Sequence, residues 1–453
     1  MKRRLMALVL TCTLVSSFVG CGNTSDTATE VSSSSVESSA PESKETETSQ
    51  EEPSAYEVTE PISIEFWCAY GEEAKYSWWA DCVDRFNASQ NLITVNMVQI
   101  SGYAETDKQI TAAQAAQTGL PAVSLINYPR VLTYANSGML EPLNEFVDET
   151  GYDISDFYDG LVNPLILDSD NQLYGLPAGA SGACYYFNQD MIDSLDLEIP
   201  ETWEEMKTFA KAVYDATGNA GFGFMSELNY VEVLMRTSAC DPLGDGVTSD
   251  MMNEKLISWL SEMKEMVDAG YMTFYNGADY SGDIQNDFYN GKVAAIQHTS
   301  SIAAMVCENS DFTVGARAQM KGSEETLSTA AGAAFIIPAA NEQPVKNAAW
   351  QFIQYALNEE NMTEWSIVGS VYPAKKSVLE SNARLESLYA QYPLIEDIYA
   401  GMDNLVSKNK TPYQTAAYKV LLNAMGQIIY DNADLESTWA AAAEEVDGIL
   451  SGN

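Results

Sequence analysis

The chain has 453 residues, with 65 acidic and 23 basic side chains and a formal charge of −42 at pH 7. A charge of this sign and size repels a phosphate backbone, so the composition excludes a nucleic-acid-binding protein and disfavours a strongly anionic ligand unless a local basic pocket exists. The single histidine, His298, nearly excludes a histidine-based metal site and a catalytic triad. The length suffices for two domains or one large one.

Residues 1–20 have the pattern of a secretory leader. Three basic residues at positions 2–4 precede an apolar run over 5–19, which is too short to remain as a membrane-spanning helix. The run ends in Phe18-Val19-Gly20-Cys21, which resembles a bacterial lipoprotein lipobox. The resemblance implies cleavage before Cys21 and lipidation of its thiol, which would anchor the protein to the outer face of the cell membrane. A plain secretory signal with an incidental cysteine is the alternative.

Residues 21–60 differ in composition from everything that follows. They are rich in Ser, Thr and Glu and contain few large apolar side chains. Such a segment cannot bury enough apolar surface to offset the entropy lost on ordering. We therefore expect a disordered, solvated tether between the lipidated Cys21 and the folded part.

The folded part begins with alternating strand-like and helix-like patterns. Apolar residues alternate with polar ones from Ile62 to Phe66, which predicts a strand, and a helix is expected from about Ala74. Two further strands are predicted at Leu92–Ile100 and Ala122–Ile126. Thr202 and Glu205 have the spacing of a capping box, which predicts a helix that Gly218 would end.

Later segments continue the same alternation. Further predicted elements are a helix over 250–270, strands at 293–297, 313–316 and 333–337, helices around Trp350 and Met362, and a helical C-terminus from Ala416. Tryptophans on helical stripes are expected in the core, and these are Trp79, Trp203, Trp259 and Trp350. Strands that alternate with helices indicate an α/β architecture.

Five cysteines remain once the leader and Cys21 are set aside, namely Cys68, Cys82, Cys184, Cys240 and Cys307. Their number is odd, and no Cys-x-x-Cys motif occurs. This pattern fits neither a disulfide framework nor a zinc site. We expect most of them to be buried free thiols and expect no cofactor, with a Cys68–Cys82 bridge as the alternative.

Several short motifs along residues 61–453 occur together in one protein family. They include Ile64-Glu65-Phe66-Trp67, Leu173-Tyr174-Gly175-Leu176-Pro177, Thr202-Trp203-Glu204-Glu205-Met206, Phe288-Tyr289-Asn290-Gly291-Lys292 and Ala348-Ala349-Trp350-Gln351-Phe352. Through these motifs the chain resembles the extracellular solute-binding proteins, family 1, of bacterial ABC importers, which include maltose-type and glycerol-phosphate-type binders. Each motif alone is common, and their collinear order behind a lipoprotein leader carries the resemblance.

The resemblance implies a two-lobed α/β fold of the periplasmic-binding-protein-like type II class, with a ligand cleft between the lobes. It places the crossings between lobes near 181–185, 295–298 and 340–345. The N-terminal lobe would comprise 61–180 plus 298–342, and the C-terminal lobe 185–295 plus 345–453. A single lobed enzyme domain with a similar alternation is the alternative.

A sugar site needs polar groups for the ring hydroxyls and aromatic faces for the C–H groups. The candidates in the first half follow predicted strands, and they are Trp67, Tyr70, Glu72, Tyr103, Glu105, Asn127 and Tyr128. The candidates in the second half are Asn229, Tyr230, Ser300, Ser301, Gly332 and Tyr372. Other interpretations stay open: Trp67 and Tyr230 can be packing residues, Glu105 a solvated acid, and the two serines a helix cap.

Two departures from the family narrow the class of ligand that the chain is expected to bind. Its glycerol-phosphate binders use an arginine in the C-terminal helical region and a tyrosine in a Gly-Tyr-x-Pro stretch. The corresponding positions hold Tyr418 or Lys419, and Val371. These differences favour a neutral glycan, and serines at the place of a tryptophan argue against maltose.

We therefore expect a non-enzymatic, monomeric capture protein for a mono- or oligosaccharide, which would deliver its ligand to ABC permease subunits in the membrane. An extracellular glycan-acting enzyme is one alternative, although no pair of acids stands out as an acid/base pair. A sugar sensor or adhesin that uses the same cleft is another. Neither is excluded by the residues themselves.

Overall fold

The computed structural model describes residues 55–322, 330–380, 383–406 and 411–452. Pro53–Asn453 forms one compact unit. The predicted leader, Cys21 and most of the predicted tether lie outside the described residues. In the described part, no helix is both long and apolar enough to cross a membrane.

One sheet runs through the compact unit, in the order β2-β1-β3-β11-β6-β9-β7-β8 with β10 beside β6. Its N-terminal half consists of β1 (Ile62–Cys68), β2 (Ile93–Gln99), β3 (Val123–Asn127), β11 (Ala330–Ile336) and the first part of β6 (Leu176–Asn188). The first two strands and β3 are parallel, whereas β11 runs antiparallel to β3 and to β6. The first three predicted strands are thereby confirmed.

Each of the three parallel strands leads into a helix. The helices are α1 (Glu73–Ser89), α2 (Tyr103–Ala116) and α3 (Tyr128–Asn136). Because parallel strands end at one edge of a sheet, all three helices begin at that edge. The chain thus brings three helix N-termini together before any side chain is considered.

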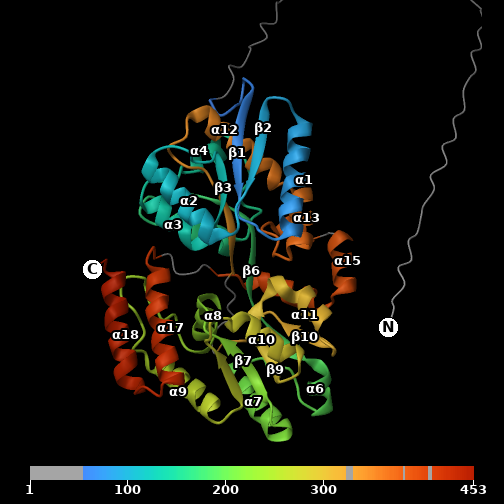
Figure 1. Cartoon of the computed structure of the whole chain (residues 1–453), viewed down its shortest axis with the longest axis vertical. Coiled ribbons are helices and arrows are strands. Elements are labelled where there is room, and N and C mark those ends of the chain that lie inside the picture. The colour runs from blue at the N-terminus through green and yellow to red at the C-terminus, as the bar shows by residue number, and fades with distance from the viewer. Residues whose placement is uncertain (1–54, 323–329, 381–382, 407–410, 453) are drawn as a thin grey trace, which may run out of the picture. The chain divides into compact units, whose positions relative to one another are not determined.

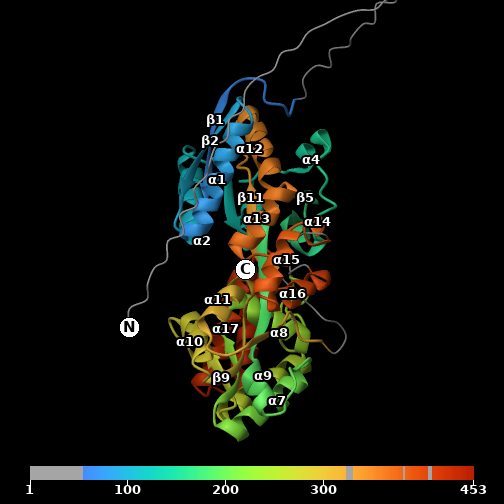
Figure 2. The ribbon, with the colours of Figure 1, turned by 90° about the vertical axis from the view of Figure 1, so that its right-hand side faces the viewer.

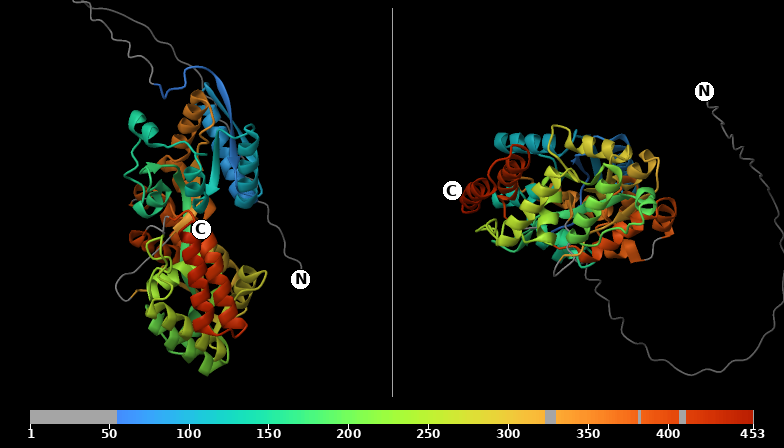
Figure 3. Two further views of the ribbon diagram at one scale, coloured as in Figure 1. Left: turned by 90° about the vertical axis from the view of Figure 1, so that its left-hand side faces the viewer. Right: turned by 90° about the horizontal axis from the view of Figure 1, so that it is seen from below.

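The C-terminal half of the sheet consists of the second part of β6 with β7 (Ala220–Met225), β8 (Met272–Tyr275), β9 (Val293–Thr299) and β10 (Val314–Arg317). Its helices are α6 (Gln189–Ser194), α7 (Trp203–Thr217), α8 (Leu228–Ser238), α9 (Glu254–Asp268), α10 (Tyr280–Tyr289), α11 (Ala303–Asn309), α17 (Gln414–Tyr430) and α18 (Leu435–Leu450). The capping box of Thr202 and Glu205 is confirmed at the start of α7, and Gly218 ends this helix with φ of 77°. The last two helices pack side by side along this half (Figure 3).

Strand β6 joins the two halves (Figure 1). Its residues up to Gly182 pair with β11, and its residues from Ala183 pair with β9. Strand β6 therefore changes its partner strand between Gly182 and Ala183. This point lies inside the first expected crossing, 181–185. We call the two halves with their helices the N-terminal and the C-terminal lobe.

The other lobe boundaries differ from those expected. The segment 298–317 lies with the C-terminal half, because β10 pairs with β6 beyond the crossing. In contrast, α12 (Gln343–Ala356) and α13 (Glu359–Gly369) lie with the N-terminal half, where Phe352 packs on Phe66 at 5.1 Å between ring centroids. The apolar faces of these helices cover β1 and α1, which the order of motifs along the chain does not reveal. Figures 1 and 2 both show α13 beside α1.

Large aromatic side chains fill both cores. Trp79, Trp203, Trp259 and Trp350 are all buried, as their positions on helical stripes predict. Each such side chain contributes on the order of 2–3 kcal/mol through burial. These four tryptophans therefore stabilise the lobes and are not available to a ligand.

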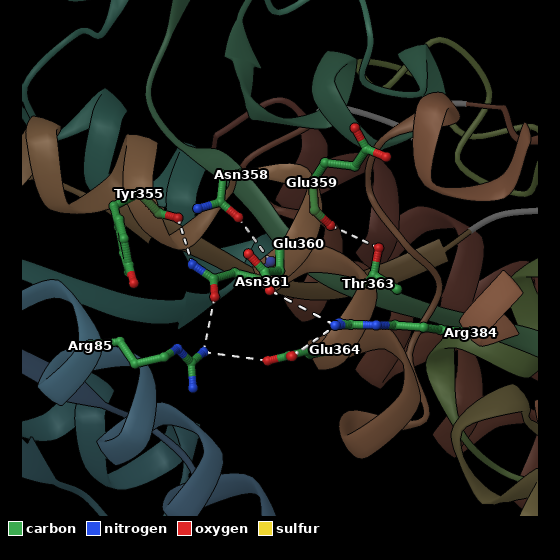
Figure 4. A network of polar contacts seen from close by, with 9 residues as sticks. All are labelled: Arg85, Tyr355, Asn358, Glu359, Glu360, Asn361, Thr363, Glu364 and Arg384. Carbon is green, nitrogen blue, oxygen red and sulfur yellow. Dashed lines mark hydrogen bonds and ion pairs between the residues drawn. The ribbon is translucent and has the colours of Figure 1, made fainter. Parts of the chain in front are cut away.

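A polar network fastens α13 to its neighbours at the surface (Figure 4). Arg85 of α1 donates to Asn361 Oδ1 at 2.9 Å and approaches Glu364 Oε2 at 3.4 Å. Glu364 also pairs at 3.0 Å with Arg384 of α15 (Ala383–Gln391). One carboxylate thus lies between two guanidinium groups from different helices.

The end of the predicted tether is ordered rather than disordered. From residue 55 the chain lies against the N-terminal lobe, where Asn347 Nδ2 donates to the Ala55 carbonyl at 2.9 Å. The Tyr56 ring packs edge-on against Phe146 at 5.0 Å, and its hydroxyl donates to Glu145 at 2.7 Å. This aromatic contact is the physical reason that the folded part begins at residue 55, six residues before the expected start at 61.

Candidate ligand-binding cleft

A cavity of about 680 Å³ lies between the two lobes, beside the crossing strand β6. Its N-terminal wall includes Tyr70, Gly71, Glu72, Lys75, Gly102, Tyr103, Asn127, Pro129 and Arg130. Its C-terminal wall includes Glu227, Leu228, Asn229, Ser301 and Thr415, and its floor includes Gly179, Ala180, Ser181, Gly332, Ala333 and Val371. We call this cavity the cleft. Its volume falls in the range of small-molecule sites.

The N-terminal wall is built from the first turns of α1, α2 and α3. The residues before these helices are Glu72, Gly102 and Asn127, and none of them caps its helix with a side-chain hydrogen bond. The first N–H groups of a helix have no partner within the helix, and the helix dipole is positive at this end. The wall therefore offers hydrogen-bond donors to oxygen atoms of a ligand.

Two tyrosines supply the aromatic surface of this wall. The Tyr103 hydroxyl donates to the Tyr70 hydroxyl at 3.1 Å, and the two rings meet edge-on at 6.0 Å. Burial raises the pKa of Tyr103 to about 12 and raises the pKa of Tyr70 well above its ordinary value. Both side chains are therefore neutral phenols at physiological pH. They can donate hydrogen bonds and present an aromatic face at the same time.

The two cationic side chains of the N-terminal wall are paired. Lys75 lies 2.7 Å from Glu72, and Arg130 lies 2.9 Å from Asp107. Because each cation has an adjacent carboxylate, the wall carries little net charge. This balance suits a ligand with many hydroxyl groups better than one with a dense negative charge.

The C-terminal wall starts from the N-terminus of α8. Glu227 caps this helix, with Oε2 accepting from the Asn229 N–H at 3.0 Å and Oε1 accepting from Asn229 Nδ2 at 3.0 Å. The carboxylate therefore fixes the orientation of the Asn229 amide. Ser301 and Thr415 add hydroxyl groups from segments far apart in the chain.

The structure brings seven of the predicted residues to the cleft lining, namely Tyr70, Glu72, Tyr103, Asn127, Asn229, Ser301 and Gly332. Gly332 lies on the floor where β11 approaches β6 closely. A Cβ at this position would collide with the carbonyl oxygen of Gly179. The glycine is therefore needed by the backbone, and it leaves the floor open.

Six predicted residues lie near the cleft without lining it, namely Trp67, Glu105, Tyr128, Tyr230, Ser300 and Tyr372. Trp67 is buried in β1, and its Nε1 lies 3.4 Å from Glu65. Glu105 lies in the first turn of α2, where it pairs with Lys108 at 3.2 Å. Tyr128 is buried at the start of α3, because the first side chain of this helix packs into the core.

Tyr230 and the two remaining residues form a layer behind the lining. The Tyr230 ring packs against His298 of β9 at 5.8 Å. Ser300 and Tyr372 lie under the floor, 4% and 1% exposed. A direct ligand contact by any of these side chains stays a prediction.

Several lining residues carried no prediction, and Lys75, Glu227 and Thr415 are among those with polar or charged side chains. Lys75 is the third residue of α1, within the first turn after Glu72, so its position could be found once the start of α1 was placed at residue 73. Glu227 could be found by its capping role only if α8 was known to begin at residue 228. Thr415 reaches the cleft from α17, and no local signal indicates this long-range approach.

Residues typical of metal sites do not gather in the described part of the chain, where no group of three His, Cys, Asp or Glu side chains could hold an ion. Cys68, Cys82, Cys184, Cys240 and Cys307 are all free thiols. Burial raises the pKa of Cys68 and of Cys82 to about 12, so both are unreactive. The alternative, a Cys68–Cys82 bridge, is wrong, because both thiols are free.

Comparisons with known proteins agree with this geometry. Residues 81–397 match the family described as bacterial extracellular solute-binding protein. A curated relative in Brucella abortus (strain 2308), named as a binding protein, is 22% identical over 380 residues, which cover 81% of this chain and 88% of the relative.

Solved structures share the fold. The cyclic α-maltosyl-1,6-maltose binding protein of Arthrobacter globiformis has a TM-score of 0.76 and 18% identity, covering 87% of this chain and 100% of that one. UgpB of Mycobacterium tuberculosis, in complex with glycerophosphocholine, has a TM-score of 0.74 and 19% identity, covering 87% and 99%. Lmo0181 of Listeria monocytogenes, in complex with cycloalternan, has a TM-score of 0.71 and 16% identity, covering 86% and 99%. These likenesses establish the two-lobed fold.

Proposed function

Since the chain belongs to the bacterial extracellular solute-binding proteins, we propose that it captures a neutral mono- or oligosaccharide in the cleft and delivers it to an ABC importer. The observation that carries the proposal is the cavity of about 680 Å³ with polar walls from both lobes. Tyr70 and Tyr103 supply an aromatic face, and the helix N-termini supply donors for hydroxyl oxygens.

The named ligands of the similar structures support a carbohydrate. Two of the three are described with cyclic α-maltosyl-1,6-maltose and with cycloalternan, and the third with glycerophosphocholine. A phosphate ester would need a cation that is not already neutralised. The pairing of Lys75 with Glu72 and of Arg130 with Asp107 therefore favours the glycan.

Capture would proceed by closure of the lobes. A ligand that touches both walls gains contacts in the closed arrangement, so it shifts the population toward that arrangement. The closed protein would then present both lobes to the permease, which must loosen the ligand to pass it on. Micromolar affinity, about −8 kcal/mol, suits capture followed by release.

A panel of ligands tests the proposal. The protein from Pro53 to Asn453, one compact unit, would be melted with maltotriose, cellotriose, free hexoses and glycerophosphocholine. A ligand that binds only the folded state raises the melting temperature by mass action. A rise with one class of glycan supports the proposal. A rise with glycerophosphocholine alone contradicts the neutral ligand, and degradation of a glycan during incubation supports the enzyme alternative.

Anchoring is part of the same proposal and has its own test. Replacing Cys21 with serine removes the thiol that would carry the lipid. We expect the Cys21→Ser protein to be released from cells into the medium, while the unaltered chain remains with the membrane fraction. Release of both proteins into the medium would indicate the plain secretory signal, and equal retention of both in the membrane fraction would contradict anchoring through the Cys21 thiol.

A further inference from the structure

A further cavity, of about 590 Å³, lies along the segment 374–405 and shares no lining residue with the cleft. Its walls come from α5 (Asp159–Val162), α14 (Lys376–Glu380), α15, α16 (Leu394–Tyr399) and the short 3-10 helix η3 (Ala400–Asn404). The last three of these α-helices lie together on one side of the molecule (Figure 2). We call this space the second cavity, and its volume also falls in the range of small-molecule sites.

The second cavity is a neighbour of the cleft. Tyr399 lines the second cavity, and its hydroxyl donates to the Val371 carbonyl at 3.0 Å. Val371 lines the floor of the cleft. The two cavities are therefore close together but have separate linings, so a binding experiment must distinguish them.

Part of the lining of the second cavity is aromatic and aliphatic. The rings of Tyr389 and Tyr399 meet edge-on, with 6.1 Å between their centroids. Leu379 and Met402 add aliphatic side chains, and both Tyr399 and Met402 are buried. Such a surface suits the C–H groups on the face of a sugar ring.

The polar part of the lining has hydrogen-bonding capacity to spare. Within the part of the chain that the structure describes, neither the Glu396 carboxylate nor the Tyr389 hydroxyl makes a hydrogen bond. Burial raises the pKa of Tyr389 to about 12, so this hydroxyl is a phenol that can donate. Lys376 Nζ donates to the Ser155 carbonyl at 3.1 Å and lies 3.9 Å from Asp159 Oδ1, which leaves further N–H groups of the ammonium for a ligand.

The mixture of charges selects a class of ligand. Asp159, Glu380 and Glu396 line the second cavity together with Lys376. The carboxylates would repel an anion, and the ammonium would repel a cation at close range. A neutral polyhydroxyl compound can donate to the carboxylates and accept from Lys376 and Tyr389.

We propose that the second cavity is a second binding site, which takes one neutral sugar or polyol unit. A single unit makes few contacts, so we expect a Kd on the order of 1 mM. A titration at micromolar ligand would therefore report the cleft alone. The inference does not rest on the proposed function, because the class of ligand is argued from the lining of the second cavity.

The Met402 methyl group is a local reporter, because Met402 lines the second cavity and no methionine is among the described residues that line the cleft. Methyl spectra of protein with carbon-13-labelled methionine would be recorded during addition of glucose, galactose or mannitol, and Met402→Leu would assign the signal. Choline and glucuronate are the cationic and anionic comparisons. We expect a saturable shift of the Met402 signal with a neutral probe and none with the charged probes.

Variants locate the binding. Tyr389→Ala removes the half-buried ring and Glu396→Gln removes the exposed carboxylate, and we expect the Kd to rise about fivefold or more in each. Because Glu396 is exposed, its variant keeps the test decisive if Tyr389→Ala does not fold. The matched control is Asp397→Asn, which alters the exposed neighbour of Glu396 outside the lining and should keep the Kd within about twofold.

Several results would overturn the inference. One is the absence of a Met402 shift at about 100 mM of every neutral probe. Others are saturation by choline or glucuronate alone, an unchanged Kd in both Tyr389→Ala and Glu396→Gln, and a shift that is lost in Tyr70→Ala, which would place the ligand in the cleft. The proposed function fails on a different result, the absence of glycan binding at micromolar concentration, so the two proposals are tested independently.

Discussion

The two walls of the cleft are made in different ways. The N-terminal wall lies where three adjacent parallel strands end, and it offers helix N-termini and a pair of tyrosines. The C-terminal wall draws on α8, on the residues after β9 and on α17, and it offers a carboxylate, an amide and hydroxyl groups. One wall is a property of the sheet, whereas the other is assembled from distant segments. We therefore expect the first to provide the common platform and the second to adjust specificity.

Acid should affect the C-terminal wall most. His298 lies in β9, and its ring packs against Tyr230. The same ring faces Ser281 and Gln285, which belong to α10. Burial lowers the pKa of His298 from 6.5 to about 4. Between these pH values the unfolded chain binds a proton at this position and the folded protein does not. The free energy of unfolding should therefore fall by about 3 kcal/mol as the pH decreases through this window.

The measurement is chemical denaturation from pH 7 to pH 4, compared between the unaltered protein and His298→Gln. The variant should lack this part of the slope, whatever its stability at pH 7. Parallel curves for the two proteins would show that His298 does not resist protonation.

Removing the aromatic face should affect binding next most. Tyr70→Ala takes away one of the two rings of the N-terminal wall, and we expect the affinity for a bound glycan to fall about 30-fold, or about 2 kcal/mol. Calorimetric titration would measure it. Tyr128→Phe is the control, because its buried hydroxyl has no hydrogen-bond partner among the described residues and its ring does not line the cleft. A Kd for Tyr70→Ala within threefold of the original would show that the Tyr70 ring does not contact the glycan.

A change in the C-terminal wall should cost less. Asn229→Ala deletes one amide whose position Glu227 fixes, and we expect about a fivefold weaker affinity, or about 1 kcal/mol. Ligand preference across the glycan panel should change more in this variant than in Tyr70→Ala. Asn219→Ala, which removes a bond to the Gly291 carbonyl away from the cleft, controls for general destabilisation. An unaltered preference would argue against a division of roles between the walls.

The smallest effect is expected far from both walls. Glu364→Gln weakens the network between Arg85 and Arg384, whose side chains are largely solvated. Surface pairs of this kind contribute below about 1 kcal/mol and are screened by salt. The free energy of unfolding should decrease slightly at low ionic strength and not at high ionic strength, with an unchanged Kd. A large loss that persists in salt would indicate a structural role for the network.

The difference between the walls also explains what could be predicted from the sequence. Tyr70, Tyr103 and Asn127 lie at or just after the ends of predicted strands, and the edge of a parallel sheet brings such positions together. Trp67 and Tyr128 lie only three positions and one position from the lining residues Tyr70 and Asn127, yet both are buried in the core. Apolar residues with a period of two or 3.6 locate a strand or a helix, but they do not fix its last or first residue. That terminal residue decides which side chain faces the cleft.

Long-range contacts account for the remaining differences. The apolar stripe of α12 packs on β1, and the stripe itself does not say which half of the sheet it covers. Thr415 enters the cleft from a helix that begins more than a hundred residues after Ser301. Such contacts depend on the path of the whole chain, so local motifs indicate the fold class and the first wall better than the lobe boundaries and the second.

Calorimetric titration of the protein from Pro53 to Asn453 with the glycan that raises its melting temperature tests the central claim most directly. We predict saturable binding at one site, weakened separately by Tyr70→Ala and by Asn229→Ala, because a ligand that fills the cleft would touch both walls. Binding that is equally tight in both variants would place the ligand elsewhere and contradict the account.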